Sequence, residues 1–144
     1  MPAIQSWVGY ALLSAAFAAL TAIFAKLGLE GVDSDYATLI RTSVIFVVLT
    51  AIVVGLGKWR NPLSLSGNTL IFLTLSGLAT GASWLCYFRA LKVGEAAQVA
   101  PVDKLSVVLV AIFAVMFLGE RPSLREWAGI GLVTAGVLLL TLRK

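Results

Sequence analysis

The sequence contains no histidine, a single cysteine and only seven acidic residues among its 144 residues. Without histidine and a second cysteine, it cannot form a Ser-His-Asp triad, a histidine-ligated zinc site or an intramolecular disulfide. It also lacks the glycine-rich loop that cradles phosphate groups. We therefore expect no enzymatic activity, no catalytic residue, no metal site and no cofactor. Cys86, the lone cysteine, is expected to be a small buried apolar side chain.

Charge is scarce as well, because 12% of the residues are charged whereas 60% are hydrophobic. In soluble domains, about a quarter of the residues are usually charged. The hydrophobic residues form long continuous runs, and an α-helix needs about 20 apolar residues to cross a bilayer. Barrel strands would instead alternate apolar and polar residues. The sequence thus predicts an all-α integral membrane protein, a bundle of five transmembrane helices with short loops.

We expect the helices to form a single transmembrane domain over residues 1–144. Their expected bounds are about residues 7–28, 36–57, 68–91, 97–118 and 124–142. Asp33 and Ser34 can cap the second helix, and Asn61 with the proline that follows it breaks the chain before the third. Ser123 and Glu126 have the spacing of a capping box at the start of the fifth helix.

Three charged residues fall within the expected second and fourth helices, namely Arg41, Asp103 and Lys104. Arg41 and Asp103 lie roughly 8 to 9 Å from the starts of their helices, at 1.5 Å per residue. Charged residues in membrane helices usually face the bundle interior or a watery cavity. The alternatives are that Arg41 snorkels to the interface and that Asp103 interacts with the helix dipole in a first turn.

Because successive helices cross the membrane in alternating directions, the starts of the second and fourth helices and the ends of the first and third lie on one membrane face. We expect a polar vestibule there, in which Asp103 balances Arg41 or Arg89. If the fourth helix begins before Pro101, this proline interrupts its hydrogen bonds beside two charges. Transporters build sites on such broken helices.

Basic residues are nearly balanced between the two faces. The N-terminal face has Lys58, Arg60, Arg121 and Arg125, and the other has Lys26, Arg89, Lys92, Arg143 and Lys144. A near balance permits insertion both ways and hence an antiparallel homodimer. If Arg41 and Lys104 are also counted, the second face has seven basic residues against four, which instead favours a cytoplasmic C-terminus. The net charge of +4 suits lipid headgroups as partners and not nucleic acid.

Several motifs accompany the five expected spans. They are Phe117-Leu118-Gly119-Glu120-Arg121-Pro122-Ser123, Tyr87-Phe88-Arg89-Ala90-Leu91 and Ala100-Pro101-Val102-Asp103-Lys104-Leu105-Ser106. Together they make nearly the whole chain resemble the EamA domain of the drug/metabolite transporter superfamily, in its single-domain five-span branch. The resemblance implies a multi-pass secondary carrier or exporter of the cytoplasmic (inner) membrane of a prokaryote.

The chain departs from the related small multidrug resistance proteins, whose first helix carries an acidic residue that couples substrate to protons. Its own first helix offers only small polar side chains such as Ser14. Proton coupling and cationic-drug export are therefore not carried over. Trp84 could line a substrate path or serve packing. The candidate substrate-path residues are Arg41, Asp103, Lys104, Ser14 and Trp84.

Two functions follow. The first is a secondary transporter or exporter that moves a small polar or amphipathic metabolite and acts as a homodimer among membrane lipids. The second is a noncatalytic accessory membrane subunit, or a component that flips a lipid-linked group with a partner.

Overall fold

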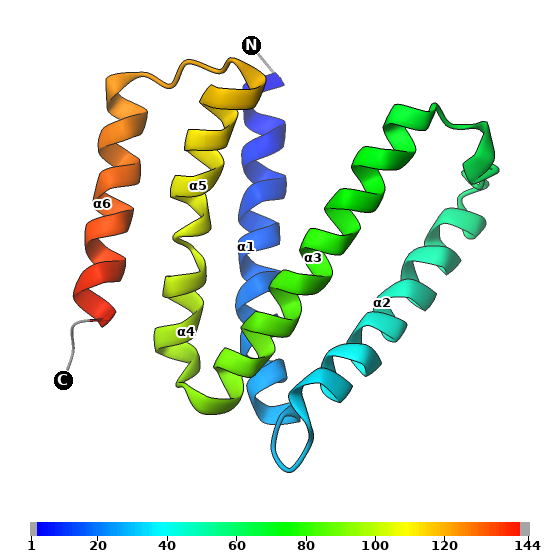
Figure 1. The fold of residues 1–144 in the computed structure, drawn as a ribbon, viewed down its shortest axis with the longest axis horizontal. Helices are drawn as coiled ribbons and strands as arrows, with labels where there is room; N and C mark the ends of the chain where they lie inside the picture. Colours follow the sequence, from blue (N-terminus) through cyan, green and yellow to red (C-terminus); the bar gives the residue numbers. More distant parts are fainter. Residues whose placement is uncertain (1–2, 142–144) are drawn as a thin grey trace. The chain divides into compact units, whose positions relative to one another are not determined.

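The computed structural model describes residues 3–141, whose regular elements are all helical. In chain order they are α1 (Ala3–Gly28), α2 (Ser34–Gly55), the 3₁₀ turn η1 (Pro62–Ser64), α3 (Gly67–Val93), α4 (Ala96–Asp103), α5 (Ser106–Phe113), the π-helical turn η2 (Ala114–Leu118) and α6 (Leu124–Thr141) (Figure 1). Five helical stretches are long and apolar enough to cross a membrane: Trp7–Gly28, Ser34–Gly55, Gly67–Val93, Ala96–Leu118 and Leu124–Thr141. The expected fold class is thereby confirmed.

Side-chain caps explain where two of the helices begin. The Asp33 carboxylate accepts hydrogen bonds from the backbone N–H groups of Asp35 and Tyr36 at 3.0 and 3.1 Å, so α2 begins two residues earlier than expected. It also ends earlier, at Gly55, because Gly57 follows in a left-handed conformation with φ of 64°.

The expected capping box at the start of α6 is present. The carboxylate of Glu126 accepts from the Ser123 backbone N–H at 2.6 Å, and the Ser123 hydroxyl accepts from the Glu126 N–H at 3.4 Å. The expected end of this helix at Leu142 lies outside the described residues.

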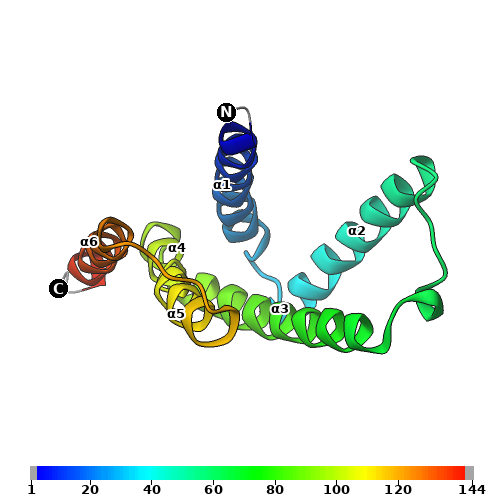
Figure 2. The same cartoon turned by 90° about the horizontal axis from the view of Figure 1, so that it is seen from above.

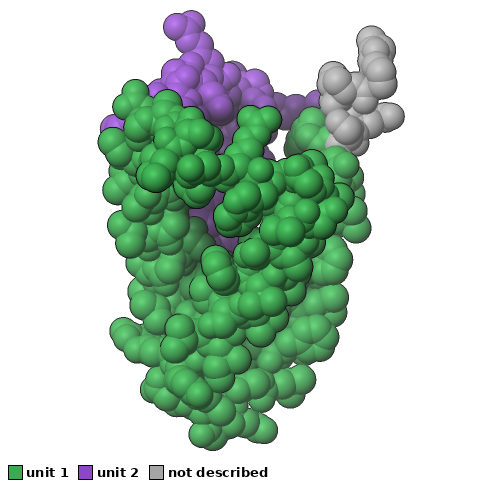
Figure 3. Space-filling view, turned by 90° about the vertical axis from the view of Figure 1, so that its right-hand side faces the viewer, with its two compact units in different colours: residues 1–93 green, residues 94–144 purple. Residues whose placement is uncertain are grey.

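The chain divides into two compact units, residues 1–93 and 94–144, which Figure 3 colours separately. The first unit contains α1, α2, η1 and α3, and the second contains α4, α5, η2 and α6. That the whole chain forms a single domain stays a prediction.

The core of the first unit lies where α1 ends, α2 begins and α3 ends. Its buried residues are Ala22, Leu29, Ser34, Thr38, Phe88 and Leu91. From this end α2 and α3 spread apart toward η1, as Figure 2 shows. Most other apolar side chains of these helices are exposed, which suits contact with lipid or with partner helices. Cys86 is among the exposed residues, so the expectation that it is buried is wrong.

In the second unit the fourth span is interrupted. It begins at Ala96, so Pro101 lies inside α4, where it cannot donate a backbone hydrogen bond. The helix stops at Asp103, and a short turn with i→i+3 hydrogen bonds, such as Lys104 N to Pro101 O at 3.0 Å, leads into α5. The sequence predicted an interruption beside these two charges if the helix began early, as it does.

Candidate functional site

Arg41 is held against two aromatic rings of α3. It lies seven residues after the start of α2, which is about 10 Å along the helix. Its guanidinium carbon lies 4.3 Å from the centre of the Trp84 ring and 5.3 Å from that of Phe88. Both distances are within the range of cation–π attraction. The half-buried arginine is thus fixed by neighbours and does not extend freely into solvent.

The spacing of the α3 residues explains this arrangement. Trp84 and Phe88 are four residues apart and Leu91 follows three later, so the three side chains lie on one face of the helix. Phe88 is 3% exposed and Leu91 is fully buried. The aromatic support of Arg41 is therefore anchored in the core of the first unit.

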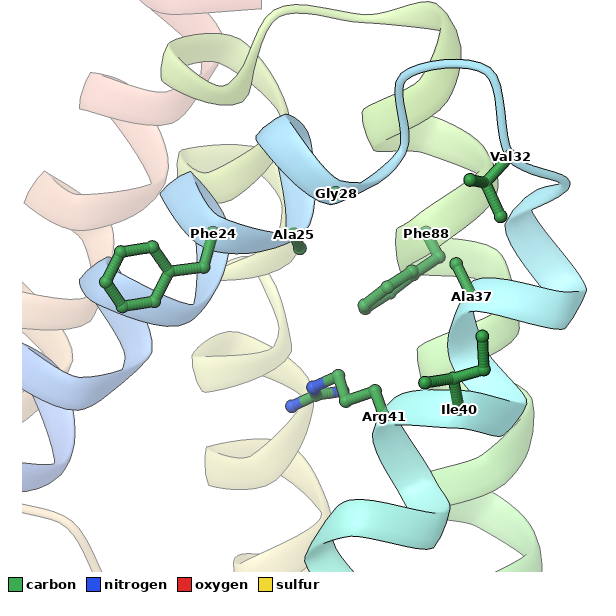
Figure 4. Close-up of a pocket in the computed structure, with 8 residues that line it drawn as sticks. All are labelled: Phe24, Ala25, Gly28, Val32, Ala37, Ile40, Arg41 and Phe88. Carbon is green, nitrogen blue, oxygen red and sulfur yellow. The ribbon is translucent and has the colours of Figure 1, made fainter.

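A cavity of about 240 Å³ lies beside the guanidinium, within the first unit. It is lined by Phe24, Ala25, Gly28, Val32, Ala37, Ile40, Arg41 and Phe88, and we call it the Arg41 pocket. Figure 4 shows Arg41 on α2 and Phe88 on α3 pointing into the space between the helices, whereas the ring of Phe24 points away from it. Arg41 is the one charged residue of an otherwise apolar lining.

Two acids near this pocket are engaged elsewhere. Asp33 caps α2, and Asp35 pairs with Arg89. The hydroxyls of Thr38 and Thr42 donate to backbone carbonyls one turn earlier in α2, at 2.8 and 2.7 Å. Within the described part of the first unit, Arg41 therefore has aromatic neighbours but no carboxylate partner.

A second polar group, the charged clasp, ties the helix ends of the first unit together. It consists of Lys26, Asp35, Arg89 and Lys92. Arg89 donates to both carboxylate oxygens of Asp35, at 2.9 and 2.6 Å. Lys26 donates to the backbone carbonyl of Leu91 at 2.7 Å, and Lys92 donates to that of Val32 at 2.8 Å. The clasp thus connects α1, α2 and the loop before α2 to α3.

We predict that Arg89→Gln destabilises the first unit modestly. The pair with Asp35 is bidentate, which favours it, but the side chains of Arg89 and Asp35 are 61% and 45% exposed, so water screens their attraction. Thermal unfolding in detergent should show a small decrease in melting temperature for Arg89→Gln and for Asp35→Asn. The double variant should lose less than the sum of the two. Strict additivity would show that the pair is not coupled.

The other sequence candidates lie apart from the Arg41 pocket or in the other unit. Ser14 is exposed on α1, 11 residues before the lining residue Ala25, which is about 16 Å along the helix. Asp103 and Lys104 belong to the second unit, where they pair with each other at 3.2 Å. The structure thus brings together Arg41 and Trp84, and the expected balance of Asp103 with Arg41 or Arg89 stays a prediction.

The sequence alone did not predict the roles of two residues in this region. Asp35 is the partner that the structure gives Arg89, and it lies in the first turn of α2. Phe88 forms a wall of the pocket. Its spacing from Trp84 was the available signal, because aromatic residues one turn apart share a helix face. Among residues 3–141 no cluster of three or more metal-ligating side chains occurs.

Comparisons with known proteins find similar transporters. The model of the EamA-like transporter family matches residues 5–142. An uncharacterized transporter in the cobO 3′ region of Sinorhizobium sp. is 62% identical over 136 residues, which cover 94% of this chain and 96% of that protein. A probable 4-amino-4-deoxy-L-arabinose-phosphoundecaprenol flippase subunit ArnE of Yersinia pestis is 30% identical over 84 residues, covering 58% of this chain and 74% of the subunit. No solved structure matches significantly.

Proposed function

Because the chain belongs to the EamA-like transporter family, we propose that it is a secondary transporter of a small polar or amphipathic metabolite. It is a multi-pass membrane protein, and we place it in the cytoplasmic membrane of a prokaryote. The observation that carries the proposal is the Arg41 pocket, a cavity between membrane-spanning helices with one cationic side chain. Such a site can bind a solute, and transport needs no catalytic group.

The broken fourth span supplies a second element of this mechanism. Discontinuous helices allow a transporter to expose polar backbone at a site and to move one part of the helix against the other. Asp103 and Lys104 lie at the break, and together with Arg41 they are our candidates for the substrate path.

Uptake into liposomes tests transport directly. We predict that a library of small metabolites, screened by thermal shift, contains at least one solute that stabilises the purified protein. That solute should then accumulate in proteoliposomes with saturable kinetics, and empty liposomes should not take it up. If solutes that bind fail to cross under imposed ion and proton gradients, secondary transport is contradicted.

We propose that the working form is a homodimer. A cavity of this size beside largely exposed helices is small for a complete path, and a second copy can cover the apolar surface that the chain leaves open. Gly77, Gly81 and Gly131 leave room for such a contact, because a Cβ placed on any of them, as on the other glycines of these helices, would meet no atom within 4 Å in the described chain. Open small residues permit close contact with another helix. An antiparallel arrangement agrees with the near balance of basic residues.

An accessory subunit is the second candidate function, and the matches to flippase subunits favour it. In that case the exposed helix faces bind a different membrane protein. The mass of the purified protein in detergent separates the two: a stable homodimer that transports alone supports the first candidate. A chain that is stable and active only with another subunit supports the second.

A further inference from the structure

The charge of the Arg41 pocket determines what it can hold. A lone guanidinium surrounded by apolar side chains is costly, because charged groups within a membrane are stable only when they are paired or hydrated. Within the first unit, the described acids do not pair with it. A cationic ligand would add repulsion, whereas an anionic ligand would neutralise the site. The pocket is therefore suited to an anion.

The geometry of Arg41 favours an oxyanion. Its guanidinium carbon lies over the Trp84 ring, 4.3 Å from the ring centre, so the ring supports the cation without being a hydrogen-bond acceptor for it like a carboxylate. Hydrogen bonds to a guanidinium are made at its N–H edges, and within the described first unit no carboxylate pairs with those of Arg41. A carboxylate or phosphate can accept two parallel hydrogen bonds from such an edge. A single arginine can neutralise a single negative charge.

The remaining walls determine the rest of the ligand. Seven of the eight lining residues are apolar, from Phe24 and Ala25 on α1 to Ile40 on α2 and Phe88 on α3. At about 240 Å³, the cavity is smaller than the pockets of roughly 300 Å³ or more that hold drug-sized ligands. It can hold a small organic acid, or the head and first carbons of an anionic lipid.

From these observations we infer that the Arg41 pocket binds an amphipathic oxyanion, with the carboxylate or phosphate head on Arg41 and the apolar body against α1 and Phe88. The inference rests on the proposed transport function and names its substrate class. Binding converts a charged pocket into a neutral one, which makes the loaded state easier to enclose in apolar surroundings than the empty state. Trp84 lies against the Arg41 guanidinium without lining the pocket, and it acts as a positioning residue.

Fluorescence of Trp84 provides the test. A background protein with Trp7, Trp59 and Trp127 changed to phenylalanine retains Trp84 as its single tryptophan. In nanodiscs of phosphatidylcholine, which has no net charge, this protein is titrated with cyclohexanecarboxylate, cyclohexylammonium or cyclohexylmethanol. We expect a saturable change with the carboxylate alone. Arg41→Gln should weaken it by about tenfold to a hundredfold, since hydrogen bonds to charged groups contribute that much. Arg125→Gln, at an exposed arginine of α6, is the matched control and should bind as the background does.

Phosphatidic acid added to the nanodiscs identifies the source of the anion. If it abolishes the carboxylate response of the background protein but not that of Arg41→Gln, measured at carboxylate concentrations that saturate the weakened site, the ligand is an anionic lipid. If the carboxylate still binds, the ligand is a water-soluble acid. Either result supports the oxyanion site. Equal responses to the ammonium and carboxylate probes, or unchanged binding in Arg41→Gln, would overturn it. Binding is measured without transport, so oxyanion binding without uptake would refute the transport function alone, and uptake that is insensitive to Arg41→Gln would refute this site alone.

Discussion

Replacing Arg41 with glutamate is expected to lower the uptake of an anionic substrate by at least about a hundredfold, because attraction worth roughly 2 to 5 kcal/mol is replaced by repulsion. The substitution places a carboxylate where the guanidinium lies over Trp84 and lines the pocket. It removes both the hydrogen bonds to the substrate and the cation–π contact. The loss should therefore exceed that of Arg41→Gln, which removes attraction without adding repulsion.

Two variants make this result specific. Arg41→Lys keeps the charge but loses the planar edge, so uptake should fall between wild type and Arg41→Gln. Arg125→Glu makes the same change of charge at an exposed position in the first turn of α6, and its uptake should remain near wild type. Initial rates in proteoliposomes, corrected for the amount of folded protein, give the comparison. Wild-type uptake by Arg41→Glu would show that the substrate does not use this pocket.

Much of the fold could be predicted from the sequence because lipid imposes a simple requirement. A spanning segment must satisfy its own backbone hydrogen bonds and must be long enough, so continuous apolar runs indicate helices directly. Local chemistry was equally readable where donor and acceptor are close in sequence, as with Ser123 and Glu126. The break after Asp103 was one of two alternatives that the sequence left open, and it could be anticipated because proline has a local effect on its own helix.

Contacts between distant residues were harder to predict. Asp35 and Arg89 are 54 positions apart, and no local pattern connects a first-turn acid to a base near the end of another helix. Only the folded chain shows that the end of α3 lies beside the start of α2. The same holds for Arg41, whose depth in its helix was predictable but whose position over Trp84 depends on how two helices cross. Sequence therefore located the charge, and the structure supplied its surroundings.

Burial in this chain also departs from the pattern of soluble proteins. Apolar runs predict which residues leave water but not which of them contact protein and which contact lipid. Cys86 and Leu91 both lie near the end of α3, yet Cys86 is exposed and Leu91 is fully buried. The hydrophobic effect does not distinguish these two environments, because lipid tails are as apolar as a protein core. Packing distinguishes them, and packing depends on the arrangement of the helices.

Leu91→Ala should consequently destabilise the protein by about 2 to 5 kcal/mol, the range found when a buried leucine leaves a cavity. Leu91 is fully buried where α1, α2 and α3 meet, so its side chain contacts protein and not lipid. The backbone carbonyl that accepts from Lys26 is unchanged by the substitution. The loss therefore reports side-chain packing, and not the removal of this hydrogen bond of the charged clasp.

Leu78→Ala is the matched control, since Leu78 lies on the same helix and is 67% exposed. Lipid can fill the space that its side chain leaves, so its effect should be a small fraction of that at Leu91. Unfolding by denaturing detergent in mixed micelles, followed by helical circular dichroism, measures both variants.

Because Phe88 is buried near Leu91 and lines the Arg41 pocket, loosening of this core should also weaken probe binding in Leu91→Ala but not in Leu78→Ala. Equal destabilisation by the two variants would instead show that the helices are held together without a packed core at this end.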